Sequence, residues 1–186
     1  MKGLLLIVFT LIVVTNISNA EDKLSITGWG GLTIPTGFLD DLYDAGIGFA
    51  GNIEYRIVPS IGITASIGYY RWSATEEISN GIEETFESSL STIPLLGGLK
   101  YYLLPGSTSP YASLEAGIHF VSWEETFASK TGSDSGSDIG FGAGGGVLIF
   151  LNPDFQIDAN IKYNSINTET DPLTFISALI GIRIVL

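Results

Sequence analysis

The sequence contains no cysteine, one methionine and one histidine. A disulfide framework, which many exported domains carry, is therefore excluded as a source of stability. Charged residues are also scarce, at 15% of the chain against 45% hydrophobic residues. A soluble protein usually carries about 25–35% charged residues on its surface. This composition leaves too little charge to cover a soluble exterior and favours a surface that faces lipid.

Basic residues are the scarcest charges, because 8 Lys and Arg stand against 20 Asp and Glu, for a net charge of −12. Nucleic-acid binding needs a basic patch, so no nucleic-acid partner is expected. Long apolar runs are missing beyond the N-terminus, where no stretch reaches 18 consecutive apolar residues. The sequence therefore predicts no transmembrane helix after the N-terminal segment.

The first twenty residues are typical of a secretory signal peptide. Lys2 supplies the positive region, Leu4 to Val14 form the apolar region, and Ser18-Asn19-Ala20 resembles a small-residue cleavage site before Glu21. The apolar region is shorter than the roughly 20 residues that a spanning helix needs. We therefore predict a signal peptide over residues 1–20 and one exported domain over residues 21–186.

Period-2 alternation of apolar and polar residues dominates the rest of the chain. It is clearest from Phe155 to Asn164, where every second residue is apolar. A β-strand places two such sets of side chains on opposite faces. Seven further segments follow the rule, at approximately 24–32, 45–58, 61–74, 90–104, 110–125, 138–151 and 173–186. The pattern predicts an all-β fold, an eight-stranded antiparallel up-and-down transmembrane β-barrel.

The connections alternate in length. Short, turn-forming stretches lie at Pro59-Ser60, 105–109 and 152–154, whereas 33–44, 75–89 and 126–137 are long and polar. Outer-membrane barrels combine short periplasmic turns with longer external loops. Pro94 interrupts the fourth segment, because proline cannot donate to a strand ladder. We expect either a bulge at Pro94 or a strand that begins nearer Leu95.

The polar face of the predicted strands carries small residues and a balanced set of charges. Small side chains suit the crowded interior of an eight-stranded barrel, so this face is predicted to point inward. Buried charges need partners, and we predict a lumen charge network. Its members are Glu54, Arg56, Lys100, Glu115, Asp158, Lys162 and Arg183.

Aromatic residues on the apolar face gather near the strand ends, as in the girdles that mark membrane interfaces. The predicted girdle consists of Tyr55, Tyr101 and Phe155 at the periplasmic end, and Tyr69, Phe120, Phe141 and Tyr163 at the outer end. Strand propensity alone also enriches aromatic residues, which is the simpler explanation of the same pattern.

Several segments resemble the outer-membrane β-barrel domain family: Ser91 to Tyr102, Pro110 to Gly117, and Gly140 to Gly146 with the strand at 155–164. The family includes small barrels of the OmpX and Ail type, the OmpA transmembrane domain and OmpW. The resemblance implies a Gram-negative outer-membrane protein in contact with membrane lipid and lipopolysaccharide and inserted by the barrel-assembly machinery. Family members usually end in Phe or Trp, whereas this chain ends in Ile184-Val185-Leu186.

Motifs for catalysis or cofactor binding are weak. Gly46 to Gly51 and Gly140 to Gly145 match G-x-G-x-x-G, but a dinucleotide site needs a helix after the motif, and both lie in predicted strands. His119 shares the polar face with Glu115, about 13 Å away along the strand. One histidine without cysteine makes no zinc site. We expect no enzyme, no cofactor and no metal centre. If the protein were an enzyme, a serine or a carboxylate would have to lie beside His119.

The predicted long loops are acidic. Their carboxylates are Asp40, Asp41, Asp44, Glu76, Glu77, Glu83, Glu84, Glu87, Glu124, Glu125, Asp134 and Asp138. Oxygen-rich clusters of this kind could bind divalent cations that bridge to lipopolysaccharide phosphates, whereas a solvated acidic rim is the simpler interpretation.

Two functions fit this sequence. The first is a monomeric barrel with a structural or cell-surface interaction role and a lumen plugged by charges. The second is a narrow pore or an OmpW-like transporter of small apolar molecules. Leu96, Leu148 and Phe150 fall partly on the inward face, where they could line an apolar pocket for such a molecule.

Overall fold

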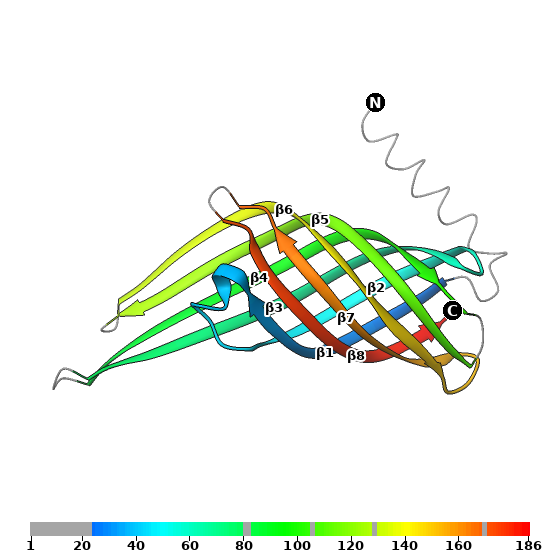
Figure 1. Ribbon diagram of the computed structural model, residues 1–186, viewed down its shortest axis with the longest axis horizontal. Helices are drawn as coiled ribbons and strands as arrows, with labels where there is room; N and C mark the ends of the chain where they lie inside the picture. Colours follow the sequence, from blue (N-terminus) through cyan, green and yellow to red (C-terminus); the bar gives the residue numbers. More distant parts are fainter. Residues whose placement is uncertain (1–23, 80–82, 105–106, 128–129, 169–170) are drawn as a thin grey trace, which may run out of the picture.

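The computed structural model describes residues 24–79, 83–104, 107–127, 130–168 and 171–186. Eight strands follow one another around a closed barrel in sequence order (Figure 1). The strands are β1 (Leu24–Thr36), β2 (Gly46–Val58), β3 (Ile61–Ser79), β4 (Glu83–Tyr102), β5 (Thr108–Phe127), β6 (Lys130–Phe150), β7 (Phe155–Ile166) and β8 (Leu173–Val185). A 3-10 helix, η1 (Gly37–Leu39), lies between β1 and β2.

The predicted eight-stranded antiparallel up-and-down barrel is confirmed. Each strand pairs antiparallel with the next, and β8 closes the ring by pairing with β1 from Ser25 opposite Val185 to Thr36 opposite Thr174. In the part of the chain that is described, no helix is long and apolar enough to cross a membrane. The predicted signal peptide at residues 1–20 lies outside the described residues.

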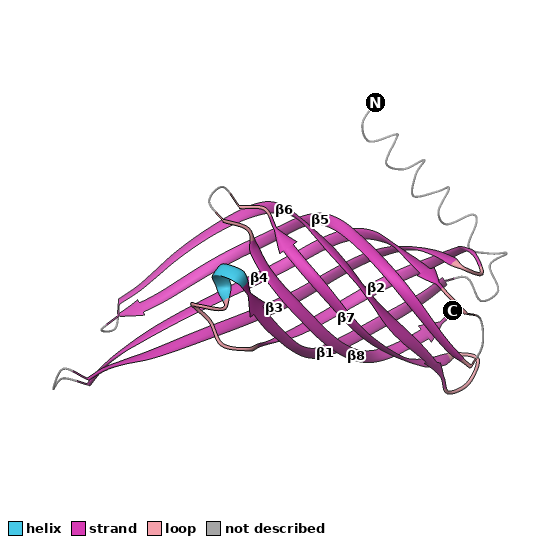
Figure 2. Cartoon of the chain, viewed as in Figure 1, coloured by secondary structure: helices cyan, strands magenta, loops and turns pink. Residues whose placement is uncertain are grey.

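Four neighbouring strands continue far beyond the barrel. Strands β3 to β6 have 19 to 21 residues, whereas the other four have 12 or 13. The β3–β4 ladder runs on to Ser79 opposite Glu83, and the β5–β6 ladder runs on to Phe127 opposite Lys130. Because β4 and β5 also stay paired as far as Phe86, the extensions form one four-stranded sheet, here called the projecting sheet (Figure 2).

The segments 75–89 and 126–137, which the sequence analysis assigned to loops, are largely strand. Residues 75–79 and 83–89 belong to β3 and β4, and residues 126–127 and 130–137 belong to β5 and β6. Residues 132–137 of β6 are exposed on both faces of the projecting sheet, so this part of the strand needs no apolar alternation. Alternation was the signal used to assign strands, and it fades where neither face is buried. The connection at 33–44 is also shorter than expected, because β1 continues to Thr36.

Pro94 lies inside β4, and both expectations for it were wrong. The ladder with β5 passes through Pro94 opposite His119 without a shift of register. On the other side, pairing with β3 lapses between Leu95 and Thr92 and resumes in the same register, so no bulge forms. Pro94 packs against Gly68, where an added Cβ would lie 3.3 Å from the Pro94 ring. The strand thus accommodates the proline by losing local pairing on one side only.

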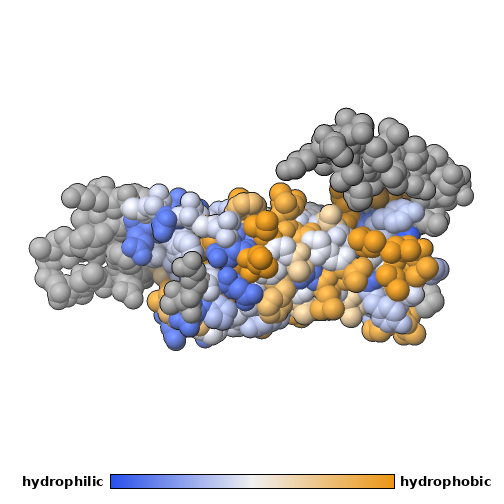
Figure 3. Space-filling view, turned by 90° about the horizontal axis from the view of Figure 1, so that it is seen from above, coloured by the Kyte–Doolittle hydropathy of each residue, from blue (hydrophilic) through white to orange (hydrophobic). Residues whose placement is uncertain are grey.

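Side chains alternate between a filled interior and an apolar outer wall. Isoleucine and leucine side chains on the outside are widely exposed, such as Leu114 at 65%, Ile161 at 62% and Ile180 at 61%. Figure 3 shows this hydrophobic surface over the barrel wall and hydrophilic surface toward the end where the sheet projects. Exposed apolar area of this extent is stable only against lipid.

Both ends of the described chain lie at the barrel end with the short turns. The start of β1 and the C-terminus are found there together with the β2–β3, β4–β5 and β6–β7 connections, and the projecting sheet lies at the opposite end (Figure 1). Short turns are periplasmic in outer-membrane barrels, so the projecting sheet points to the cell exterior.

Two glycines of β1 allow a matched test of barrel closure. A Cβ on the inward Gly31 would collide with the Ala178 carbonyl oxygen and lie 2.9 Å from Leu179 Cα, whereas a Cβ on Gly28 meets nothing within 4 Å. We expect Gly31→Val to lower the free energy of unfolding by about 1–3 kcal/mol, the usual cost of overpacking. Gly28→Val should change it little. Urea unfolding, followed by heat-modifiable gel mobility, measures both, and equal effects would contradict a close β1–β8 contact at Gly31.

Candidate functional site

Glu54 lies at the centre of the periplasmic half of the lumen. This carboxylate, fully buried on β2, accepts hydrogen bonds from both terminal nitrogens of Arg183 on β8, at 2.8 and 3.1 Å. The Tyr102 hydroxyl on β4 lies 2.7 and 2.8 Å from the two Glu54 oxygens. Lys100 and Arg56 each have a nitrogen 3.5 Å from the same carboxylate. One anion therefore holds strands β2, β4 and β8 together across the lumen.

Asp158 extends this cluster to the other side of the barrel. It accepts a hydrogen bond from Lys100 at 3.2 Å and from the Tyr111 hydroxyl at 2.6 Å. Lys162, also on β7, forms a separate pair with Glu115 of β5 at 2.8 Å. Trp29 lies between the two groups, with its ring 5.1 Å from the Lys100 ammonium and 5.7 Å from that of Lys162. Such ring contacts stabilise cations that are removed from water.

The structure places all seven residues of the predicted lumen charge network inside the barrel. Six are buried, and Arg56 keeps a side-chain exposure of 22% near the periplasmic mouth. They form two groups: Glu54, Arg56, Lys100, Asp158 and Arg183 in one, and the Glu115–Lys162 pair in the other.

Tyr102 and Tyr111 are the lumen residues that the sequence analysis missed. Tyr102 lies two residues after Lys100, and Tyr111 lies four residues before Glu115. Alternation therefore places both tyrosines on the inward face, and this signal could have found them. Each phenol donates to a buried carboxylate, and Leu148 packs against both rings. Phe150 packs at the edge of this cluster, and Leu96 is also buried. Leu96 and Leu148 therefore pack inside the lumen, and neither lines one of the hollows found among the described residues.

The outer half of the lumen is closed by an apolar cluster, here called the outer cap. Trp72 and Phe175 meet edge to face at 4.7 Å, and Tyr70 lies 5.3 Å from Phe175. Leu39 of η1, only 2% exposed, completes the cap from the β1–β2 connection. Gly37 adopts a positive φ of 62°, which glycine tolerates, and so turns the chain for Leu39 to enter the barrel mouth.

His119 lies within this packed interior. Its Nδ1 is 3.4 Å from the Thr92 hydroxyl, and both residues are 1% exposed. Asp138 of β6 lies directly opposite His119 in the β5–β6 ladder, and no hydrogen bond joins the two side chains among the described residues. The two glycine motifs lie within β2 and β6, in strand and not before a helix.

The aromatic residues predicted to form the girdle all point outward. Tyr101 and Phe155 lie near the periplasmic rim and are 53% and 44% exposed, with Tyr55 beside them on β2. Tyr69, Phe120, Phe141 and Tyr163 lie at the outer rim, with exposures between 38% and 49%. Polar residues on neighbouring strands β3, β4 and β5, here called the polar collar, follow directly beyond the outer rim. They are Arg71, Ser91 and Ser122, which lie opposite one another in the ladders.

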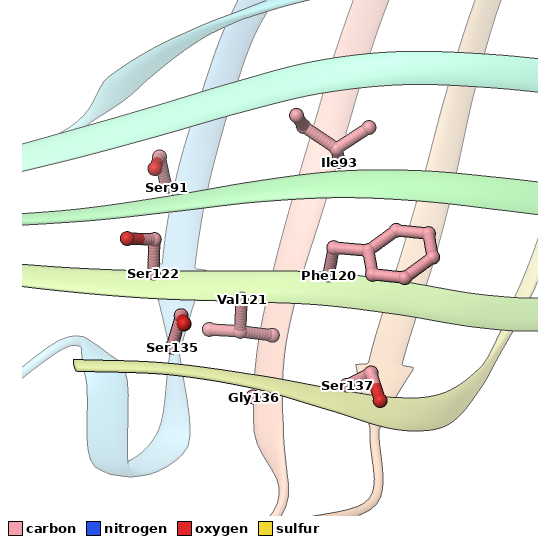
Figure 4. Close-up of a pocket in the computed structure, with 8 residues that line it drawn as sticks. All are labelled: Ser91, Ile93, Phe120, Val121, Ser122, Ser135, Gly136 and Ser137. Carbon is pink, nitrogen blue, oxygen red and sulfur yellow. The ribbon is translucent and has the colours of Figure 1, made fainter.

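The collar opens into a shallow hollow on β4, β5 and β6, here called the serine hollow (Figure 4). Its volume is about 440 Å³, and it is lined by Ser91, Ile93, Phe120, Val121, Ser122, Ser135, Gly136 and Ser137. In Figure 4 the hydroxyls of Ser91, Ser122 and Ser135 follow one another from strand to strand, and Ile93 and Phe120 lie beside them.

The acidic residues were considered as ligands for divalent cations. Within the described ranges, no three His, Cys, Asp or Glu side chains gather closely enough to hold a metal ion. Asp40, Asp41 and Asp44 lie in the connection after η1, and Glu124, Glu125, Asp134 and Asp138 lie on β5 and β6. The side chains of Glu76, Glu77, Glu83, Glu84 and Glu87 lie outside the described residues.

A closed ring of strands, an apolar wall and a filled lumen define a small membrane-spanning β-barrel. The chain belongs to the outer membrane protein beta-barrel domain family, which it matches over residues 4–181. Membership of this family places the protein in the outer membrane. No curated protein matches the sequence.

Solved structures share the fold. Neisserial surface protein A superposes with a TM-score of 0.62 at 15% identity, over 88% of this chain and 97% of that chain. Ail, the attachment invasion locus protein of Yersinia pestis, gives 0.52 at 20% identity, over 88% and 99%. The outer membrane protease OmpT of Escherichia coli gives 0.57 at 11% identity, over 88% and 79%. Identities this low show the fold alone, and the fold serves both surface proteins and an enzyme.

The central position of Glu54 can be tested by stability. Glu54→Gln keeps the shape of the side chain but leaves Arg183, Lys100 and Arg56 without their shared anion. Breaking a buried ion pair on one side typically costs about 3–5 kcal/mol, and we expect a loss near the lower end because Asp158 still neutralises Lys100. The exposed Glu124→Gln is the matched control and should change stability by less than about 0.5 kcal/mol. Similar urea midpoints for both variants would contradict this assignment.

Proposed function

We propose that this protein is a cell-surface interaction barrel, in which a closed lumen supports the projecting sheet as the binding surface. The observation that carries the proposal is the continuation of β3 to β6 beyond the barrel. A structural barrel alone would need strands only long enough to span the membrane, about 9–11 residues each. The extra length of β3 to β6 therefore lies outside the membrane, where it is available for binding.

The filled lumen argues against the alternative, a pore or transporter. The periplasmic half contains the Glu54 cluster, and the outer half contains the outer cap with Trp72, Phe175 and Leu39. A solute would have to displace both layers, one of paired charges and one of packed aromatic rings. Eight strands also enclose a lumen that side chains alone can fill.

The free edge of β6 offers a specific means of binding. The Ile139 carbonyl accepts a hydrogen bond from the Asn167 backbone N–H, so the backbone groups of odd-numbered residues in β6 point toward the β7 side. Pairing with β7 begins only at Gly140 opposite Ile166. Ser133, Ser135 and Ser137 therefore present backbone N–H and C=O groups to an edge that no described strand covers. An extended peptide could add to such an edge by main-chain hydrogen bonds.

The Asp134 side chain already accepts a hydrogen bond from one backbone N–H group of this edge. Its carboxylate accepts a hydrogen bond from the Ser135 backbone N–H at 2.8 Å. Charged side chains on a free edge prevent indiscriminate strand pairing. A partner strand would displace Asp134, and a lysine or arginine on that strand would pair with the released carboxylate. The edge thus favours extended, basic peptide segments over apolar ones.

The structural neighbours support a surface role by analogy of fold. They include neisserial surface protein A and Ail, the attachment invasion locus protein of Yersinia pestis. We also propose that residues 1–20 direct export, that the barrel-assembly machinery inserts the mature chain, and that the barrel is a monomer. Closure supports the last point, because strands β1 to β8 form a closed ring and leave no unpaired edge in the membrane for pairing with a second copy.

A closed lumen predicts the absence of ion conduction. The refolded barrel in a planar bilayer should give no discrete conductance steps, because both layers of the lumen block passage. The same detergent sample must show heat-resistant β-structure, and a known porin in the same bilayer provides the positive control. Reproducible steps would contradict the closed lumen and would favour transport.

Proline substitution tests the β6 edge. Ser135→Pro removes an N–H that faces the free edge and leaves the β5 ladder intact, whereas Ser135→Ala keeps the N–H and is the matched control. We expect a displayed library of random peptides to enrich extended basic segments on nanodiscs carrying the wild-type protein or Ser135→Ala. Ser135→Pro should reduce that enrichment about tenfold, since several main-chain bonds depend on one register. Enrichment that survives proline would contradict binding at this edge.

A further inference from the structure

We propose that the free edge of β6 selects an extended partner segment with the pattern aromatic-x-basic-x-aromatic, where x is any residue. The residues that select this pattern are Gly132, Asp134 and Gly136. The inference rests on the proposed function, because it concerns a strand that adds to the β6 edge, and it specifies which residues of that strand are recognised.

The two faces of β6 carry different side chains along this edge. Gly136 lies opposite Val121 of β5, which is 1% exposed and packs within the outer cap. Gly136 therefore belongs to the inner face of the projecting sheet, which continues the lumen side of the barrel. Alternation places Gly132 and Asp134 on the same face and leaves only serines, at positions 133, 135 and 137, on the outer face.

Asp134 selects a basic residue at the centre of the pattern. Its own backbone groups point toward β5, so a residue opposite it across the edge would form a non-hydrogen-bonded pair. The Cα atoms of such a pair lie about 4.5 Å apart, closer than in a hydrogen-bonded pair. Opposite charges in this position are stabilising, and like charges are destabilising. The Asp134 carboxylate forms no ion pair with any described residue, so a lysine or arginine would be its first.

Two further carboxylates strengthen the preference for a basic residue. Glu125 of β5 lies opposite Gly132, and Asp138 lies opposite the buried His119. Both carboxylates are therefore on the inner face, one to either side of Asp134. Because this face is acidic, it attracts a basic segment and disfavours an acidic one.

The two glycines leave space for aromatic side chains. A Cβ added at Gly132 would meet nothing within 4 Å, and one at Gly136 would meet only a carboxylate oxygen of Asp138, at 3.9 Å. An aromatic ring on a neighbouring strand covers the exposed backbone of such a glycine. Trp123 lies opposite Asp134 on β5 and is only half-buried. Rings that lie over the glycines would therefore approach the Trp123 ring from both sides, an arrangement that aromatic pairs favour.

The pattern is the same in both chain directions, because a glycine stands two residues to either side of Asp134. The two x positions of the partner would lie beside the outer-face serines. A serine hydroxyl both donates and accepts hydrogen bonds, so it discriminates little among polar residues. The edge therefore recognises every second residue of the partner segment.

Three synthetic peptides test the pattern on nanodiscs that carry the refolded protein. They are Thr-Phe-Thr-Lys-Thr-Phe-Thr, the same peptide with Glu in place of Lys, and the shuffled peptide Thr-Lys-Phe-Phe-Thr-Thr-Thr. Fluorescence anisotropy of labelled peptides measures the affinity, after subtraction of binding to empty nanodiscs. We expect the patterned lysine peptide to bind about fivefold tighter than either other peptide, since cross-strand pairs of this kind contribute about that factor.

Two variants with matched controls assign the preference to single residues. Asp134→Lys should reverse the order, so that the glutamate peptide binds about fivefold tighter than the lysine peptide. Glu124→Lys makes the same change of charge on the outer face of β5 and should keep the wild-type order. Gly136→Thr should weaken binding of the patterned lysine peptide, because a side chain then occupies the place of one ring, whereas Ser133→Thr on the outer face should not.

The outcomes separate this inference from the proposed function. Equal affinity of the patterned and shuffled peptides, with binding still lost in Ser135→Pro, would overturn the pattern and leave the β6 edge as the binding surface. A preference for lysine that persists in Asp134→Lys would also overturn it. If no peptide binds to the wild-type protein, both the pattern and the binding edge are wrong.

Discussion

The structure depends first on the absence of water from the interior of a membrane. Each backbone N–H and C=O in that layer must be satisfied by protein, because lipid tails accept no hydrogen bonds. The β1–β8 ladder, unbroken from Ser25 to Thr36, meets this requirement by removing the last two edges. Once the ring of strands is closed, each side chain within the membrane points either into the lumen or out to the lipid. The apolar wall and the filled lumen are both consequences of that division.

The two layers of the lumen have different effects on folding. The charges around Glu54 and Asp158 make the strand register unambiguous, because a slip of one residue would turn Lys100, Asp158 or Arg183 out into lipid. Their tyrosine partners, Tyr102 and Tyr111, saturate the carboxylates and so reduce the cost of burying them. The outer cap is instead held by shape and apolar contact. It can include Leu39 from a connecting segment because apolar packing requires no fixed hydrogen-bond geometry.

Sequence reasoning was strongest where one face of a strand meets lipid. Alternation from Phe155 to Asn164 located β7 almost completely, and the same rule placed Glu54, Lys100 and Arg183 inside. It failed in the projecting sheet, where the successive residues Asp134 and Ser135 lie on opposite faces and are both exposed, so that no alternation marks the strand. It also misjudged Pro94, because the residue type does not reveal that β4 loses its pairing with β3 there and keeps its pairing with β5. The pairing of Glu54 with Arg183, 129 positions apart, depends on closure and is not encoded locally.

Strands β3 to β6 pass from the membrane into the projecting sheet without interruption, and this continuity has a mechanical consequence. A partner that pulls on the sheet pulls along the strands themselves. The ladder hydrogen bonds lie perpendicular to the strands, so such a load shears many bonds at once and does not open them one after another. A surface element joined to its barrel by a flexible linker would transmit none of that load to the ring. Here the anchored barrel and the external sheet resist tension as one continuous body.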